Sequence, residues 1–177
     1  MNDSALSPIS TFLPEFEAAL PDASRLLGSA NLVVHPRVSR IVLHGSRGLA
    51  GGARPHSDID LSLIVDLPED QISESLFKDI TRTTLDNWQS VIEADLAVIY
   101  DRRKCGLRCF DQTTWQPEIC QPGGLDCFGI YKVQKGFHGF ITGAGIQVRL
   151  MYPCLKVWQR DDPYLYSGQS RPPQRRK

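Results

Sequence analysis

The chain has 177 residues, 41% of them hydrophobic, and its 20 basic and 20 acidic residues give a formal net charge of zero. That length allows one domain with a substantial core, or one domain with a small appendage. No apolar stretch approaches the roughly 20 residues of a membrane span, and the first residues lack the features of a signal peptide, so we expect a cytoplasmic globular protein.

The first hundred residues are predicted to alternate between helices and strands. Residues 10–27 carry apolar side chains at helical spacing, and Pro21 should kink or split this helix. Residues 38–44 are rich in β-branched side chains and predict the first strand of a sheet. Residues 46–50 can start a short helix. Gly51, Gly52 and Pro55 predict a loop after it.

Two more strands and a longer helix follow. Residues 58–65 alternate polar and apolar side chains, as a half-buried strand does. Residues 69–88 predict an amphipathic helix in which Glu74 and Lys78 form an exposed pair one turn apart. Residues 94–100 predict a third strand. This order indicates an α+β fold, a mixed sheet with helices on one face.

The second half of the chain has a weaker pattern. Residues 129–137 and 141–158 are rich in β-branched and aromatic side chains and predict further strands and hairpins. We therefore expect residues 102–165 to form a β-rich extension packed on a core of residues 1–101. Residues 166–177 are basic and rich in proline, and we expect a disordered tail.

Charge and cysteine content bear on the partners of this half. Residues 1–101 hold 7 Lys/Arg against 15 Asp/Glu, a difference of −8, whereas residues 102–177 hold 13 against 5, a difference of +8. Either two ordinary halves neutralise each other, or a basic segment meets an anionic ligand above an acidic site. The odd number of cysteines favours free thiols in a reducing compartment. The spacing of Cys105, Cys109, Cys120 and Cys127 lacks the C-x₂-C pattern of a zinc knuckle, which leaves structural zinc as a minor alternative.

The first predicted strand ends in a turn that suits phosphate groups. A strand that feeds Gly-Ser into a helix start leaves backbone N–H groups facing outward. Gly45 has no Cβ to obstruct a phosphate, Ser46 adds a hydroxyl and Arg47 could supply a charged fork. The plainer interpretation is a strand-to-helix turn capped by serine.

Three aspartates follow on neighbouring predicted strands. Asp58 and Asp60 are two residues apart and share a face of one strand, while Asp95 lies in the next strand. Ionised carboxylates at that distance repel each other unless a cation lies between them, and hard oxygen ligands favour Mg²⁺ or Mn²⁺. The pair alone could be the solvated side of a sheet, but the third aspartate favours a metal site.

Together these motifs resemble the signature of the nucleotidyltransferase superfamily that includes DNA polymerase beta. That signature is Gly-Ser at a strand end, then Asp-x-Asp after eleven residues, then a strand aspartate. The chain is most similar to the minimal nucleotidyltransferases, because Gly45-Ser46-Arg47 and Ser57-Asp58-Ile59-Asp60-Leu61 match their segment position by position. The similarity covers roughly residues 38–100.

The resemblance implies a nucleotidyltransferase fold and a Mg²⁺-dependent transfer of NMP, with AMP the first expectation, from an NTP such as ATP to a hydroxyl acceptor. Asp58 and Asp60 would bridge two divalent ions (Mg²⁺, with Mn²⁺ possible), and Asp95 would bind the ion that activates the acceptor. The residues that would hold the phosphates are Gly45, Ser46, Arg47 and Ser57.

The acceptor is not indicated. Relatives that modify aminoglycosides or extend nucleic acids usually carry a helical second domain, which this sequence replaces with β-rich segments. An alternative function is an antitoxin or regulatory binding protein of the same fold that acts on a helical partner of the HEPN type. The basic second half would permit a nucleic-acid acceptor, but no recognised binding module supports one.

Other side chains are weaker candidates, each with an ordinary structural explanation. His44 is interpreted as a packed strand-end histidine or a group behind the metal ligands. His56 could face the nucleotide, and Glu93 is interpreted as a surface residue rather than a ligand. Basic and aromatic residues that could touch a nucleotide, but that packing or solvation explains as well, are Lys132, Lys135, Arg149, Trp115, Trp158, Tyr131 and Tyr152.

Overall fold

The computed structural model describes residues 6–65, 67, 69–87, 93–101, 128–141 and 154–160. Its elements, in chain order, are β1 (Ser7–Pro8), α1 (Pro14–Ala19), α2 (Pro21–Gly28), β2 (Val33–Val34), β3 (Val38–His44), η1 (Gly45–Arg47), β4 (Ile59–Val65), η2 (Glu69–Gln71), α3 (Glu74–Asn87), β5 (Ala94–Asp101), β6 (Phe128–Gln134), β7 (Phe137–Phe140) and β8 (Leu155–Gln159). No helix among these residues is long and apolar enough to cross a membrane.

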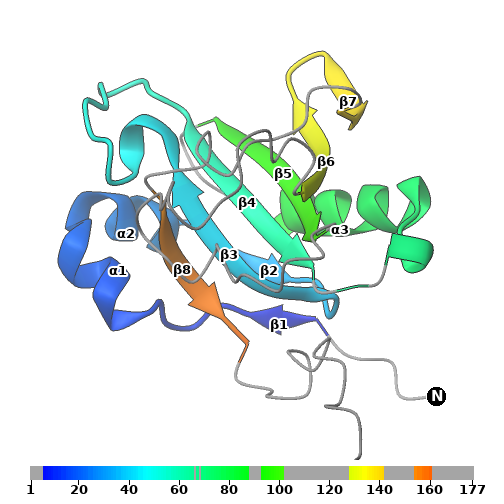
Figure 1. Cartoon of the computed structure of the whole chain (residues 1–177). Coiled ribbons are helices and arrows are strands. Elements are labelled where there is room, and N and C mark those ends of the chain that lie inside the picture. The colour runs from blue at the N-terminus through cyan, green and yellow to red at the C-terminus, as the bar shows by residue number, and fades with distance from the viewer. Residues whose placement is uncertain are drawn as a thin grey trace, which may run out of the picture.

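A six-stranded sheet forms the centre of the fold (Figure 1). Its strands lie in the order β7-β6-β5-β4-β3-β8, and β4 and β5 run parallel while all other neighbours run antiparallel. The helix α3 lies in the chain between the two parallel strands, as a parallel connection requires. This mixed sheet confirms the expected α+β class, although such an arrangement is not specific to one superfamily.

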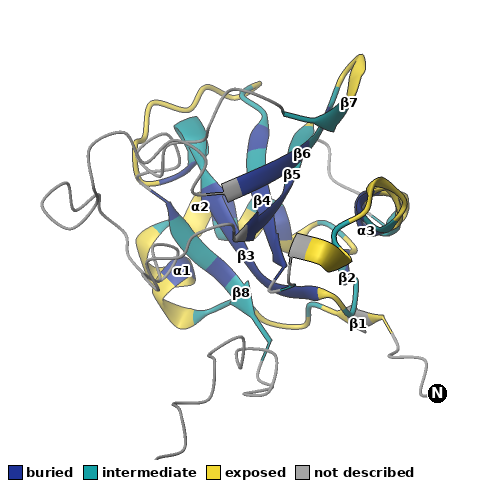
Figure 2. Cartoon of the chain, turned by 45° about the vertical axis from the view of Figure 1, so that its right-hand side comes forward, coloured by how far each residue is buried: buried dark blue, intermediate teal, exposed yellow. Residues whose placement is uncertain are grey.

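The helices pack on one face of the sheet. Phe16 of α1, Leu27 of α2 and Phe77 of α3 are buried in one core cluster together with alternate strand residues. Figure 2 shows the buried strands in dark blue and the exposed side of α3 in yellow. The strand residues in this cluster include Ile41, Leu43, Leu61, Leu63, Val65, Leu96, Val98, Tyr131 and Val157. Alternation therefore turns the residues between them toward the opposite face.

Proline explains how the first predicted helix divides. The predicted helix 10–27 is two helices, of which the first begins only at Pro14, and Leu20 between them has a non-helical backbone (φ −135°, ψ 65°). Pro14 and Pro21 each start a helix, where proline's missing N–H is not needed for an intrahelical bond. The expected break at Pro21 is thereby confirmed.

The helix α3 begins later than the sequence indicates. Residues 69–71 form the separate 3₁₀ turn η2, and the Oγ of Ser73 accepts a hydrogen bond from the backbone N–H of Leu76 at 3.2 Å. This capping satisfies one of the unpaired N–H groups of the first turn, so the helix starts at Glu74. The predicted pair of Lys78 with Glu74 is present, with a nitrogen–oxygen distance of 3.0 Å.

Strands from the second half complete both edges of the sheet. The hairpin of β6 and β7 turns at Lys135-Gly136, where the φ of +78° suits glycine. The strand predicted at residues 129–137 therefore ends earlier than expected. The strand β8 pairs with β3. Of the predicted strand region 141–158, the structure describes residues 141 and 154–158, and residues 155–158 belong to β8. The division into a core and an extension stays a prediction, and the tail lies outside the described residues.

Candidate metal centre

The strand register aligns three polar side chains across one face of the sheet. Asp60 lies opposite His44 of β3 on one side and opposite Asp95 of β5 on the other. These positions alternate with the core residues, so their side chains point away from the helices. Asp58 comes two residues before Asp60 and lies at the entrance to β4.

The three aspartates come together as the sequence predicts. One carboxylate oxygen from each of Asp58, Asp60 and Asp95 lies within 4.8 Å of the other two. Asp60 and Asp95 are half-buried, so water screens their charges incompletely. This group of oxygens could hold a metal ion.

The pKa of Asp60 is raised, first by burial and then by its acidic neighbours. Burial raises the pKa of Asp60 above its usual value of 3.8, and the charges of Asp58 and Asp95 raise that pKa further, while the ammonium of Lys132 lowers it. A carboxyl group shifted in this direction keeps its proton to a higher pH than an ordinary aspartate when no cation is present. The cluster is thus electrostatically suited to accept added positive charge.

Asp60→Asn is expected to stabilise the metal-free protein. Because the pKa of Asp60 is higher in the folded protein than in the unfolded chain, the folded state binds more protons between those two values. Stability from this group is therefore present at low pH and is lost as pH rises through the raised pKa. At neutral pH the substitution should add about 0.5–1 kcal/mol to the free energy of unfolding, a modest gain because solvent screens a half-exposed group.

Urea unfolding in the presence of EDTA, from about pH 4 to pH 8, measures this effect. Asp86→Asn is the matched control, since Asp86 is exposed on α3. An Asp60→Asn protein with the same pH profile and stability as the wild type would contradict the raised pKa of Asp60.

The turn after β3 is shaped around Asp60. Gly45 opens the 3₁₀ turn η1 with a φ of +72°, a conformation that favours glycine. A Cβ at this position would meet the Asp60 side chain, with the carboxyl carbon only 2.8 Å away. The missing side chain of Gly45 thus makes room for a carboxylate of the protein itself, and its contact with phosphate stays a prediction.

Arg47 holds the loop that leads into Asp58. Its Nε donates a hydrogen bond to the carbonyl of Ser57 at 2.8 Å, and its Nη2 donates to the carbonyls of Arg54 and Pro55, each at 3.1 Å. The Oγ of Ser57 accepts a hydrogen bond from the backbone N–H of Arg54 at 2.8 Å. Both residues were predicted to hold phosphate. In the structure they fix the backbone ahead of Asp58, and phosphate binding by them stays a prediction.

Ser46 lies in a different depression from the aspartates. It lines an open pocket of about 680 Å³ bounded by α1, α2 and the loop of residues 48–55. The Gly45-Ser46 turn therefore stands between this depression and the acidic cluster. The contacts within the protein explain the conformation of this turn without a bound phosphate. Its predicted role in phosphate binding is therefore supported only by its position next to the acidic cluster.

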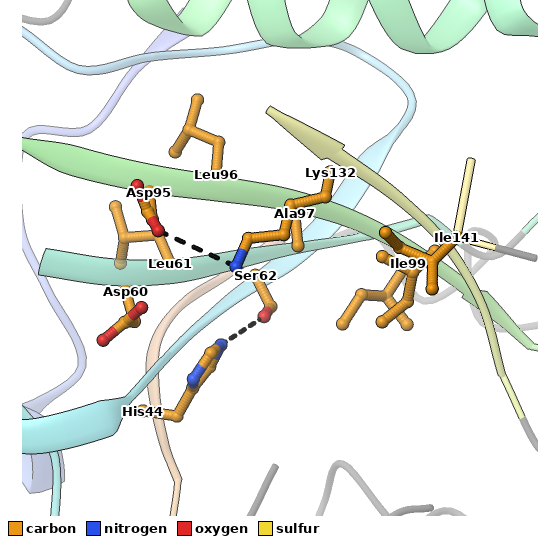
Figure 3. Close-up of a pocket in the computed structure, with 11 residues that line it drawn as sticks. His44, Asp60, Leu61, Ser62, Asp95, Leu96, Ala97, Ile99, Lys132 and Ile141 are labelled. Atoms are coloured by element: carbon orange, nitrogen blue, oxygen red, sulfur yellow. Dashed lines mark hydrogen bonds and ion pairs between the residues drawn. The ribbon is translucent and has the colours of Figure 1, made fainter. Parts of the chain in front are cut away.

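A smaller pocket of about 180 Å³ adjoins the acidic cluster. Figure 3 shows Asp60 and Asp95 at one end, Ala97, Ile99 and Ile141 toward the other, and the Lys132 ammonium directed at Asp95. One part of this pocket can therefore hold cations or polar groups, whereas the other offers apolar surface.

A histidine lies beside the aspartates in this pocket. The Nε2 of His44 and the Oγ of Ser62 are hydrogen-bonded at 2.7 Å. Burial lowers the pKa of His44, and the ammonium of Lys132 lowers it further, so the imidazole is neutral at pH 7. The structure thus gives His44 a polar partner within the pocket, beyond the packing expected from its place at a strand end.

The remaining candidates are distributed over the molecule. Tyr131 is fully buried against Phe77 and Phe140, with ring centroids 5.8 and 5.2 Å apart, so it packs in the core and cannot stack on a base. Trp158 has Arg160 over its ring at 5.1 Å. Exposed positions are His56, Glu93 and Lys135, and those outside the described residues are Trp115, Arg149, Tyr152 and the four cysteines considered for zinc.

Cys154 is the cysteine that the structure describes. It is buried, and this burial raises the pKa of its thiol to about 11. The thiol is therefore protonated at neutral pH and is a poor nucleophile and a poor metal ligand.

Lys132 is the residue of this site to which sequence reasoning gave too little weight. Its Nζ lies 3.7 Å from the Oδ2 of Asp95. The sequence shows only a lysine in a β-rich run, since nothing local indicates that β6 neighbours β5.

Comparison with known proteins adds no relative: no protein-family model and no curated protein matches the chain.

Proposed function

We propose that this protein is a Mg²⁺-dependent nucleotidyltransferase that moves NMP, with AMP the first expectation, from an NTP to a hydroxyl acceptor. The observation that carries the proposal is the meeting of Asp58, Asp60 and Asp95 beside the Gly45-Ser46 turn. The resemblance of these motifs to the minimal nucleotidyltransferases supports the same activity.

The chemistry of the three side chains fits Mg²⁺ or Mn²⁺. All offer carboxylate oxygens, the hard ligands that these ions prefer. The raised pKa of Asp60 gives a reason for the cluster to accept a cation, because bound positive charge would relieve the repulsion. Divalent ions at such sites activate an attacking oxygen and offset the charge of a leaving pyrophosphate, and we propose two of them here.

The aspartates would divide two tasks between them in this scheme. Asp58 and Asp60 would hold cations near the phosphates, on the side of the site where the Gly45 turn lies. Asp95 is on the next strand and borders the small pocket, so it would orient the acceptor hydroxyl. Catalysis would then consist of positioning and charge stabilisation.

The chief alternative is a binding protein of the same general fold, acting on a helical partner. Such a protein would work by surface contact and would not require three carboxylate oxygens within 4.8 Å of one another. For that reason catalysis is the function we propose.

Labelled nucleotides test the proposal directly. The protein is incubated with Mg²⁺, host lysate and each of the four NTPs, labelled in turn on the α- or the γ-phosphate. We expect an acceptor labelled from one α-labelled NTP, no label from the same NTP labelled at γ, and no product with EDTA. Label that arrives only from the γ-position would indicate phosphoryl transfer, and either that result or the absence of any labelled product would contradict the proposal.

A further inference from the structure

Lys132 is placed to reach the acidic cluster from the neighbouring strand. On β6 it lies opposite Ala97 of β5 and opposite Gly139 of β7. Both neighbours are small, so the lysine stem can cross above Ala97 toward Asp95, which is the diagonal neighbour on the same face. Figure 3 shows the ammonium pointing to Asp95 in this way.

The partial burial of Lys132 and Asp95 favours a persistent ion pair between them. The side chain of Lys132 is 35% exposed and that of Asp95 is 20% exposed. The methylene stem lies in the small pocket with Ala97 and Ile130, a surface that suits the apolar part of a lysine. Attraction between charges is stronger in such a partly dry site than in open solvent.

A count of charges shows what this lysine does. The three carboxylates carry a formal charge of −3, and Lys132 reduces the sum to −2. The ammonium of Lys132 thus already neutralises part of the negative charge that would attract a divalent ion. An ammonium and a metal ion cannot both be the nearest cation of the same Asp95 oxygen.

We propose that Lys132 is an internal counter-ion that competes with the metal at Asp95 and is released toward the anionic nucleotide once metal binds. The inference rests on the proposed function, because it assumes a metal site at the three aspartates. Its consequence is thermodynamic coupling: metal frees the lysine for phosphate, and phosphate draws the lysine away from the metal ligand. Lys132 would in this way make metal and nucleotide bind together.

Metal affinity without nucleotide tests the competition separately from catalysis. Mn²⁺ serves as the probe, and its dissociation constant is read from the electron paramagnetic resonance signal of the free ion. Lys132→Gln removes the charge, Lys132→Arg keeps it, and Lys135→Gln removes an exposed charge from the same hairpin. Lys132→Met keeps an apolar stem and replaces the glutamine variant if that variant does not fold.

We expect Lys132→Gln to bind Mn²⁺ about tenfold more tightly than the wild type, with Lys132→Arg and Lys135→Gln close to the wild type. In the transfer assay Lys132→Gln should raise the KM for NTP by about tenfold, because its contact with the anion is lost. Equal or weaker Mn²⁺ binding by Lys132→Gln would overturn the counter-ion role and leave the proposed activity standing. No Mn²⁺ binding by the wild-type protein would overturn both.

Discussion

Asp58→Ala is expected to abolish Mg²⁺-dependent transfer of the α-label, with a loss of at least about 10³-fold, while the protein stays folded. The same result is expected for Asp60→Asn and Asp95→Asn. Each substitution removes one of the negative charges that would hold the cations, and none of these side chains belongs to the apolar core cluster.

Stability measurements separate loss of activity from loss of folding. Removing charge from a cluster of like charges relieves repulsion, so in the Asp58 and Asp60 variants loss of activity should accompany equal or higher stability without metal. Asp95→Asn also removes the partner of Lys132, so its stability should change little. A variant that lost activity through unfolding would melt at lower temperature instead. Asp86→Ala, on the exposed side of α3, controls for the loss of an acidic side chain elsewhere. Wild-type labelling in any one of the three triad variants would contradict the role assigned to that residue.

The part of the site predicted from the sequence is the part that depends on local periodicity. Alternation over residues 58–65 placed Asp58 and Asp60 on one face, and a similar run placed Asp95 in the next strand. A parallel pair joined by a helix then brings the two strands together, as β4, α3 and β5 show. The clustering of the three aspartates was thus predictable, because a short-range pattern and a simple strand-helix-strand connection determine their positions.

The interactions that escaped prediction depend on long-range pairing. Lys132 reaches Asp95 only because β6 pairs with β5 in one particular register, and the chain between them carries no regular pattern. The bond between His44 and Ser62 likewise needs the register of β3 on β4. A shift of one residue would turn either side chain to the other face, and no local feature of the sequence sets that register.

The turn at Gly45 has a structural role that the sequence analysis does not include. The sequence predicts a phosphate contact at Gly45, because a glycine lets a phosphate approach the backbone closely. In the structure the space in front of Gly45 is taken by the carboxylate of Asp60, and the phosphate contact stays a prediction. Arg47 was likewise chosen for its charge, yet its guanidinium is engaged by three backbone carbonyls of the loop before Asp58.

Gly45→Ala is therefore expected to damage the metal centre through Asp60. The new Cβ would meet the Asp60 carboxyl group, and alanine would also be strained at a φ of +72°. We expect a loss of about 2–3 kcal/mol in the free energy of unfolding and about 10²-fold in transfer rate, because a displacement of about 1 Å suffices for such a loss. Urea unfolding and the label-transfer assay measure these two effects, and weaker Mn²⁺ binding would show the damage to the metal centre.

Gly136→Ala separates the two causes. Gly136 has a nearly equal φ of +78°, and a Cβ there would meet nothing within 4 Å, so this variant carries the strain without the collision. Asp60→Ala should then reduce the cost of Gly45→Ala to about that of Gly136→Ala, since a double-mutant cycle isolates the contact between positions 45 and 60. If Gly45→Ala costs no more than Gly136→Ala in the wild-type background, Asp60 does not lie against this turn. The arrangement of carboxylates on which the proposed activity depends would then have to be abandoned.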